Sequence, residues 1–294
     1  MAQVLPGFKT LLVGESGNGK THSIRTLLNS GIQPLVLATE PGMRALSTCE
    51  NPGCRICRTP QGKIIELPPI PWAYVGPESG GLTNLIQVAG YINTKDQSAL
   101  ASIKDMQRQG YNQFIQVLKL IEKFTDNTGK DWGNVLSWNT DRALVIDGLS
   151  SLNTMAMDMF VGRRPLYDKS DYGIAQKPLL AFITLLTAQA KCHFILMAHP
   201  ERGADEIGLS KITVNAIGKA LGPELPRLFD DMPWADRNGD KFTWNTAAIG
   251  RVSKGRNLPI KADLEPSFMQ IVESWKRAGG VIEPTLETPP AVPK

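Results

Sequence analysis

The stretch that decides the fold is KTLLVGESGNGKT, at residues 9–21. Its first six residues form a largely apolar run that ends in glycine, which predicts a buried parallel strand. Gly14–Thr21 then matches the phosphate-loop pattern G-x-x-x-x-G-K-[ST]. In this pattern backbone N–H groups surround phosphate oxygens, the lysine lies near the β and γ phosphates, and the hydroxyl binds Mg²⁺. We therefore expect a nucleotide site made of Gly14, Glu15, Ser16, Gly17, Asn18, Gly19, Lys20 and Thr21.

Apolar runs further along the chain predict more strands of the same sheet. They lie at Leu35–Thr39, Ala143–Ile146 and Phe194–Ala198, with a weaker one at Trp72–Val75. Apolar residues recur at helical spacing after the phosphate loop, so the first forty residues predict a strand–helix–strand unit with parallel strands. Near the end, the turn sequence RNGD predicts an antiparallel hairpin between Asp231–Ala235 and Phe242–Asn245. The fold class is α/β, with a mostly parallel central sheet flanked by helices.

Composition excludes several classes of protein. The chain has 294 residues, of which 42% are hydrophobic and 20% charged, so it is neither disordered nor fibrous. A net charge of +4 permits nucleic-acid binding without indicating it. No apolar run is long enough to span a membrane, and no secretory signal is recognisable. We expect a soluble, cytoplasmic protein.

Asp147 is the candidate Mg²⁺ ligand. It ends the apolar run ALVI, and an acidic residue at the end of a later strand positions magnesium in phosphate-loop proteins. The alternative is a plain Asp147-Gly148 turn that holds no metal. With the phosphate loop upstream, we favour Mg²⁺ held by Thr21 and Asp147.

Two further residues are expected at the same edge of the sheet. Glu40 follows the second strand and His199 follows the fourth. Since the carboxyl ends of parallel strands face the ligand crevice, Glu40 is a candidate base for the attacking water. His199 is a candidate γ-phosphate sensor. The alternatives are a surface glutamate opening a Pro-Gly turn and a purely structural histidine.

Taken together, GESGNGKT, TEPG, ALVIDGLSSL and FILMAHP resemble the RecA-like core, and more narrowly the phage RecA-like ATPases that anneal single strands in recombination. The resemblance implies a core over residues 1–260, with insertions at about 49–71 and 91–110. A C-terminal helix and a proline-rich tail, expected to be disordered from Glu283, occupy 261–294. The resemblance also implies ATP and Mg²⁺ as cofactors, hydrolysis at subunit interfaces of a ring or filament, and single-stranded DNA as partner.

Carried over from the family, two loops would contact DNA, Met159–Gly173 and Glu201–Gly218. The candidate DNA-binding residues in them are Arg163, Arg164, Lys169, Arg202 and Lys211. The first loop also contains tyrosines, which suit base stacking. The alternative is a pair of ordinary solvated loops.

Within the segment RVSKGRNLP, the cations Lys254 and Arg256 lie two positions apart. In an extended segment both point the same way. In RecA-like proteins the similar pair reaches the γ-phosphate held by the neighbouring subunit, so both residues are candidate catalytic groups acting in trans. A solvated basic strand end, or a DNA contact, is the alternative.

Three cysteines, Cys49, Cys54 and Cys57, have a spacing that zinc sites use. Structural zinc takes four ligands, and none of the histidines lies nearby in sequence. Reduced free cysteines are the default expectation, with zinc as the less favoured one.

Two other functions remain open. A replicative helicase or helicase loader shares the RecA-like core. A nucleotide-gated DNA-binding scaffold needs no turnover, and therefore no base at Glu40. A single-strand binding protein is a further possible partner.

Overall fold

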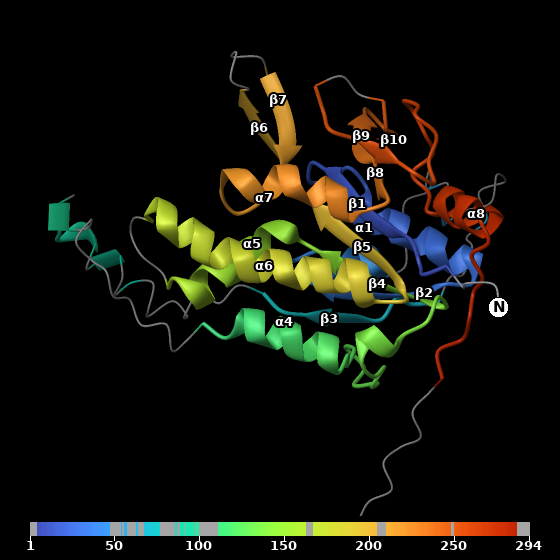
Figure 1. Ribbon diagram of the computed structural model, residues 1–294, viewed down its shortest axis with the longest axis horizontal. Coiled ribbons are helices and arrows are strands. Elements are labelled where there is room, and N and C mark those ends of the chain that lie inside the picture. The colour runs from blue at the N-terminus through green and yellow to red at the C-terminus, as the bar shows by residue number, and fades with distance from the viewer. Residues whose placement is uncertain are drawn as a thin grey trace, which may run out of the picture.

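The computed structural model describes residues 5–47, 54, 56–57, 63, 68–76, 86, 89–90, 92–96, 98–99, 111–162, 167–204, 210–247 and 250–286. Its centre is a mostly parallel sheet in the order β10-β9-β1-β5-β4-β2-β3 (Figure 1). The parallel strands are β1 (Lys9–Gly14), β2 (Gln33–Ala38), β3 (Trp72–Tyr74), β4 (Arg142–Asp147) and β5 (His193–Ala198). Each strand that the apolar runs predict is therefore present.

Helices cover both faces of this sheet (Figure 1). One face carries α4 (Gln113–Glu122), α5 (Leu149–Phe160), α6 (Lys169–Gln189) and α7 (Gly218–Glu224). The other carries α1 (Lys20–Ser23), its continuation η1 (Ile24–Ser30), and α8 (Met269–Arg277). Short 3₁₀ segments are η2 (Met43–Leu46), η4 (Val135–Ser137) and η5 (Leu225–Leu228).

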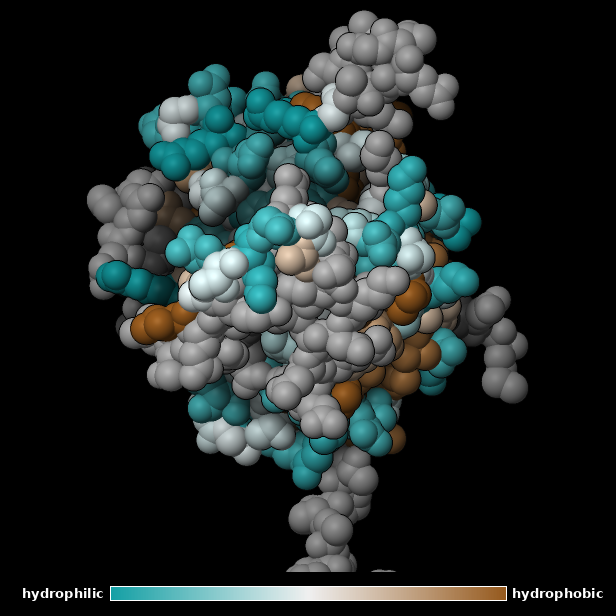
Figure 2. Space-filling view, turned by 90° about the vertical axis from the view of Figure 1, so that its left-hand side faces the viewer, coloured by the Kyte–Doolittle hydropathy of each residue, from teal (hydrophilic) through white to brown (hydrophobic). Residues whose placement is uncertain are grey.

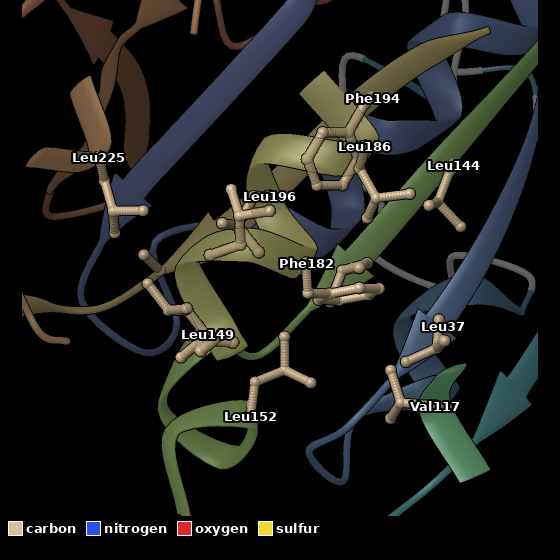
Figure 3. Packing of buried hydrophobic residues seen from close by; sticks show 14 of the residues in the cluster. Leu37, Val117, Leu144, Leu149, Leu152, Phe182, Leu186, Phe194, Leu196 and Leu225 are labelled. Carbon is tan, nitrogen blue, oxygen red and sulfur yellow. The ribbon is translucent and has the colours of Figure 1, made fainter. Parts of the chain in front are cut away.

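The two faces have separate cores because successive strand residues point to opposite sides. Leu37, Leu144 and Leu196 pack with α4, α5 and α6, including Phe182 (Figure 3). Their strand neighbours, such as Val36, Val145 and Ile195, pack instead with η1 and α8. Strands covered on both faces have to be apolar throughout, which is why plain apolar runs predict them.

The C-terminal hairpin differs in detail from the prediction. Asp231–Met232 is a separate strand, β8, and the hairpin is formed by β9 (Trp234–Asn238) and β10 (Lys241–Asn245). β8 also pairs with β11 (Lys254–Gly255). Only the first residue of the two-residue loop, Gly239, has a positive φ, of 62°. A type I′ turn, which the Asn-Gly pair favours, needs a positive φ at both positions, so the turn is of another type.

Two other predictions are wrong in part, one at the end of a loop and one at the start of the tail, whose residues from 287 on lie outside the described ones. The predicted loop to Gly173 ends early, because α6 begins at Lys169 behind a capping box made by Asp168 and Asp171. The tail is ordered through Thr285: the Glu283 amide donates to Thr140 Oγ1 over 2.8 Å, and the Asn139 amide donates to Thr285 Oγ1 over 2.9 Å. Polar partners on the loop before β4 therefore hold a segment that looks disordered from its prolines.

Candidate functional site

The phosphate-loop residues connect β1 to α1 at the carboxyl edge of the sheet. Gly17 and Gly19 both have a φ of 79°, a backbone conformation that residues with a Cβ rarely adopt. The side chain of Asn18 donates to the carbonyl of Ala235 over 2.8 Å, which ties the loop to β9. The sequence therefore places glycine where the backbone needs it and a polar anchor between.

Lys20 is buried at the base of this loop. Its Nζ donates to the carbonyl oxygens of Gly14 at 2.7 Å and Glu15 at 3.1 Å. Burial lowers the pKa of Lys20, while the charges of Asp147, Glu40 and Glu15 oppose that shift. A desolvated ammonium held within a ring of backbone groups is suited to an anionic ligand.

Thr21 and Asp147 lie next to each other, one at the start of α1 and the other at the end of β4. The hydroxyl of Thr21 donates to Asp147 Oδ2 over 2.7 Å. Burial raises the pKa of Asp147, and the hydrogen bond from Thr21 opposes the shift. A desolvated carboxylate beside a hydroxyl is an oxygen donor set that fits Mg²⁺, which coordinates such ligands together with water and phosphate.

Glu40 and His199 meet beside this pair. Ala38, Asp147 and Met197 are in register across β2, β4 and β5, so the residues that follow these strands gather at one edge. His199 Nε2 lies 3.3 Å from Glu40 Oε2. That hydrogen bond is the main reason why the pKa of Glu40 is lowered, against the opposing effect of its burial. Glu40 is therefore ionised at neutral pH.

Gly148 allows this close approach. Its φ is 122°, and a Cβ there would lie 2.4 Å from Thr39 Oγ1 and 2.8 Å from Glu40 Cγ. Thr39 also donates to the carbonyl of Gly148 over 2.7 Å. Asp147 is the last residue of β4 and Gly148 is the N-cap of α5, so this tight strand-to-helix connection lies directly against Glu40.

Two arginines lie beside the phosphate loop, and one of them was not a candidate from the sequence. A small cavity of about 40 Å³ is lined by Gly14, Glu15, Arg202 and Arg251, among others. Arg251 Nη1 lies 2.7 Å and 2.9 Å from the two carboxylate oxygens of Asp236. Arg202 Nη2 lies 3.6 Å from Glu15 Oε1. Arg251 begins the segment RVSKGRNLP, but its place beside the phosphate loop depends on a pairing between distant segments, Ile212 with Arg251.

Among the DNA-binding candidates that the structure describes, Arg202 lines a groove. β6 (Pro200–Ala204) and β7 (Ser210–Val214) form a hairpin directly after His199, where the sequence suggests a loop. With α5, α7 and the start of α6 it lines a groove of about 770 Å³ that contains Tyr167, Tyr172 and Arg202. Hydrophilic residues predominate in the upper part of the face shown in Figure 2, at the level of this hairpin. Lys169 is exposed at the start of α6. Arg163 and Arg164 lie outside the described residues, as does the side chain of Lys211.

Lys254 and Arg256 lie away from the phosphate loop of their own chain. β8, with which Lys254 pairs, contacts β1 at Thr10, near the opposite end of that strand. The Lys254 ammonium donates to the carbonyl of Phe229, and Arg256 Nη1 lies 2.9 Å from Asp230 Oδ1. Within one chain, neither cation reaches the site formed by Lys20, Thr21 and Asp147.

One histidine lies near the cysteines in space, although none does in sequence. His22, which follows Thr21 in α1, has its Nε2 2.9 Å from Cys54 Sγ and 3.6 Å from Cys57 Sγ. Cys49 lies outside the described residues. The contact is invisible in the sequence because 32 positions separate His22 from Cys54.

No protein-family model matches the chain, and no curated protein matches it significantly in sequence. Among the residues that the structure describes, no helix has both the length and the apolar character needed to cross a membrane.

Proposed function

We propose that the chain is a RecA-like ATPase that binds ATP with Mg²⁺, hydrolyses it, and acts on single-stranded DNA. The observation that carries the proposal is the meeting of Lys20, the Thr21–Asp147 pair and the Glu40–His199 pair at one sheet edge. A phosphate loop alone supports nucleotide binding. An ionised glutamate beside it supports turnover.

Each residue has a chemical task in this proposal. Lys20 exchanges its bonds to the loop carbonyls for the β and γ phosphates, and Thr21 and Asp147 hold Mg²⁺. Bound there, Mg²⁺ neutralises charge on the phosphate oxygens. Glu40 accepts the proton of the attacking water, and His199 orients its carboxylate. The β5 strand lies between the strands of the phosphate loop and of Asp147, which supports a sensor role for His199.

Action on DNA is supported by the connection between the two regions. The β6–β7 hairpin begins one residue after His199, and Arg202 lines both the small cavity beside Glu15 and the groove with Tyr167 and Tyr172. A change at the γ-phosphate can therefore reach the groove over a short path. The charge of the described groove is not strongly basic, because Asp158 and Glu201 line it together with Arg202. In this proposal the phosphates of DNA are therefore contacted by the basic residues of both candidate loops.

The proposal is tested by measuring ATP binding and ATP hydrolysis on the same preparation, with and without single-stranded DNA. Lys20→Ala should lose affinity for ATP, since it removes the buried cation from the loop. Lys119→Ala, an exposed lysine in α4, is the matched control and should bind normally. Equal affinity of Lys20→Ala and Lys119→Ala would contradict nucleotide binding at this loop.

DNA binding is tested by measuring how the affinity for a single-stranded oligonucleotide depends on salt concentration. Each phosphate contact contributes a log–log slope of about −0.7, so Arg163→Ala combined with Arg164→Ala should flatten the slope by more than one unit. An unchanged slope would place DNA binding elsewhere and leave the ATPase proposal standing. Hydrolysis at subunit interfaces, with Lys254 and Arg256 acting in trans, is part of the same proposal.

A further inference from the structure

The strongest feature outside the nucleotide site is a cluster of three metal-binding side chains. His22 Nε2, Cys54 Sγ and Cys57 Sγ all lie within 4.8 Å of one another. Cys57 is 4% exposed, while Cys54 and His22 are half-buried. The three groups come from two segments, α1 and the 54–57 segment, that the sequence does not connect closely.

One of the two nitrogen–sulfur distances matches a tetrahedral zinc centre. With Zn–S bonds of about 2.3 Å and Zn–N bonds of about 2.05 Å, tetrahedral angles separate nitrogen and sulfur by about 3.5 Å and two sulfurs by about 3.8 Å. The separation of His22 Nε2 from Cys57 Sγ, 3.6 Å, has this value. The separation of His22 Nε2 from Cys54 Sγ is 2.9 Å, and it has to increase by about 0.6 Å when zinc binds.

The chemical types of the three donors also suit a metal. Neutral imidazole and thiolate are the forms that bind zinc. Cys54 and Cys57 have the C-x₂-C spacing with which one loop supplies two zinc ligands.

We infer that His22, Cys54 and Cys57 bind a structural zinc ion, which joins the 54–57 segment to α1. The ion holds this segment against the residue that directly follows Thr21. A fourth ligand completes the tetrahedron, and the inference does not depend on which group supplies it. It is also independent of the proposed ATPase activity, because metal content is measured without nucleotide.

The experiment measures zinc per chain after purification under reducing conditions and dialysis against a weak chelator. We expect about one equivalent in the wild type. Cys54→Ser, Cys57→Ser and His22→Ala should each retain less than about a tenth of that amount, since loss of a ligand opens the site. Cys192→Ala removes a buried cysteine outside the cluster, in the core beside the sheet, and should keep its zinc.

A second measurement uses only the wild-type chain, so its result does not depend on whether a variant folds. The wild-type chain, loaded with cobalt(II) in place of zinc, should show thiolate-to-cobalt charge-transfer absorption and the visible bands of a tetrahedral site. Chelation should lower the Tm of the wild type, and added zinc should restore it. A wild type that binds no zinc under these conditions, or that carries a Cys54–Cys57 disulfide instead, overturns the inference. Full zinc content in His22→Ala overturns it as well.

Discussion

The hydroxyl of Thr21 donates a hydrogen bond to Asp147 over 2.7 Å, although the two residues are 126 positions apart. The bond connects the residue after the phosphate-loop lysine to the end of β4. Both oxygens are of the kind that Mg²⁺ prefers, and burial raises the pKa of the carboxyl. A divalent cation would relieve the desolvation of this carboxylate, so the pair is the most direct structural argument for a magnesium nucleotide.

The first prediction concerns this pair. Thr21→Val should raise the Mg²⁺ concentration needed for half-maximal ATPase at least about tenfold, because it removes an oxygen ligand and keeps the shape. Thr21→Ser keeps the oxygen and should stay near the wild type. Nucleotide binding measured in EDTA should be equal in all three proteins. An unchanged Mg²⁺ requirement in Thr21→Val would contradict the assignment.

The second prediction concerns His199. Its hydrogen bond is the main cause of the lowered pKa of Glu40, so His199→Ala should raise that pKa. A higher pKa leaves less ionised Glu40 at acidic pH, and the acid limb of the kcat/KM profile should therefore move to higher pH. His199→Gln, whose amide can still donate to Glu40, should restore part of the shift. Superimposable acid limbs in wild type and His199→Ala would rule out this coupling.

The strands and the edge where the candidate site lies could be predicted from the sequence, because buried parallel strands are continuous apolar runs whose carboxyl ends meet. The contact between His22 and Cys54 could not, since it joins residues 32 positions apart and no pattern in the sequence links them. The place of Arg251 depends in the same way on a pairing of distant segments. The sequence predicts a loop at Lys169 because the first turns of α6 are polar, and only the Asp168–Asp171 capping box marks the helix start.

The third prediction uses His193, which is buried in the core beneath Phe8. Its Nδ1 accepts from the Phe8 amide over 3.2 Å, and its Nε2 lies 3.0 Å from the Thr140 carbonyl. Burial lowers its pKa to about 3, with further lowering by the charge of Lys9. Between pH 3 and the unfolded-state pKa of about 6.5, the unfolded chain binds the extra proton, so stability rises with pH across this window.

The free energy of unfolding should therefore fall as the pH drops from 6.5 towards 4, by up to about 1.4 kcal/mol per pH unit from this residue. His193→Gln is less stable throughout but should lack this component, which the difference between the two pH profiles isolates. Denaturant unfolding at several pH values measures it. Parallel profiles would mean that His193 titrates alike in both states.

The fourth prediction separates Lys254 from Arg256. The Arg256 side chain is 71% exposed, so Arg256→Ala should keep the stability of the wild type and lose ATPase activity if it acts in trans. Lys254 is half-buried and bonded to the carbonyl of Phe229, so Lys254→Ala should also destabilise the fold by about 1 kcal/mol. Mixing Glu40→Gln with Arg256→Ala should restore part of the activity, since some interfaces then pair two intact groups. No recovery, with subunits shown to exchange, counts against the trans role.

Glu40→Gln tests the central claim most directly, by ATP affinity and ATP turnover measured on one preparation. Glutamine keeps the size of the side chain and can accept a hydrogen bond from His199, but it cannot take a proton from water. ATP affinity should remain close to that of the wild type, while kcat falls by about 10²–10⁴. Hydrolysis by Glu40→Gln at nearly the wild-type rate would contradict the assignment of Glu40 as the base.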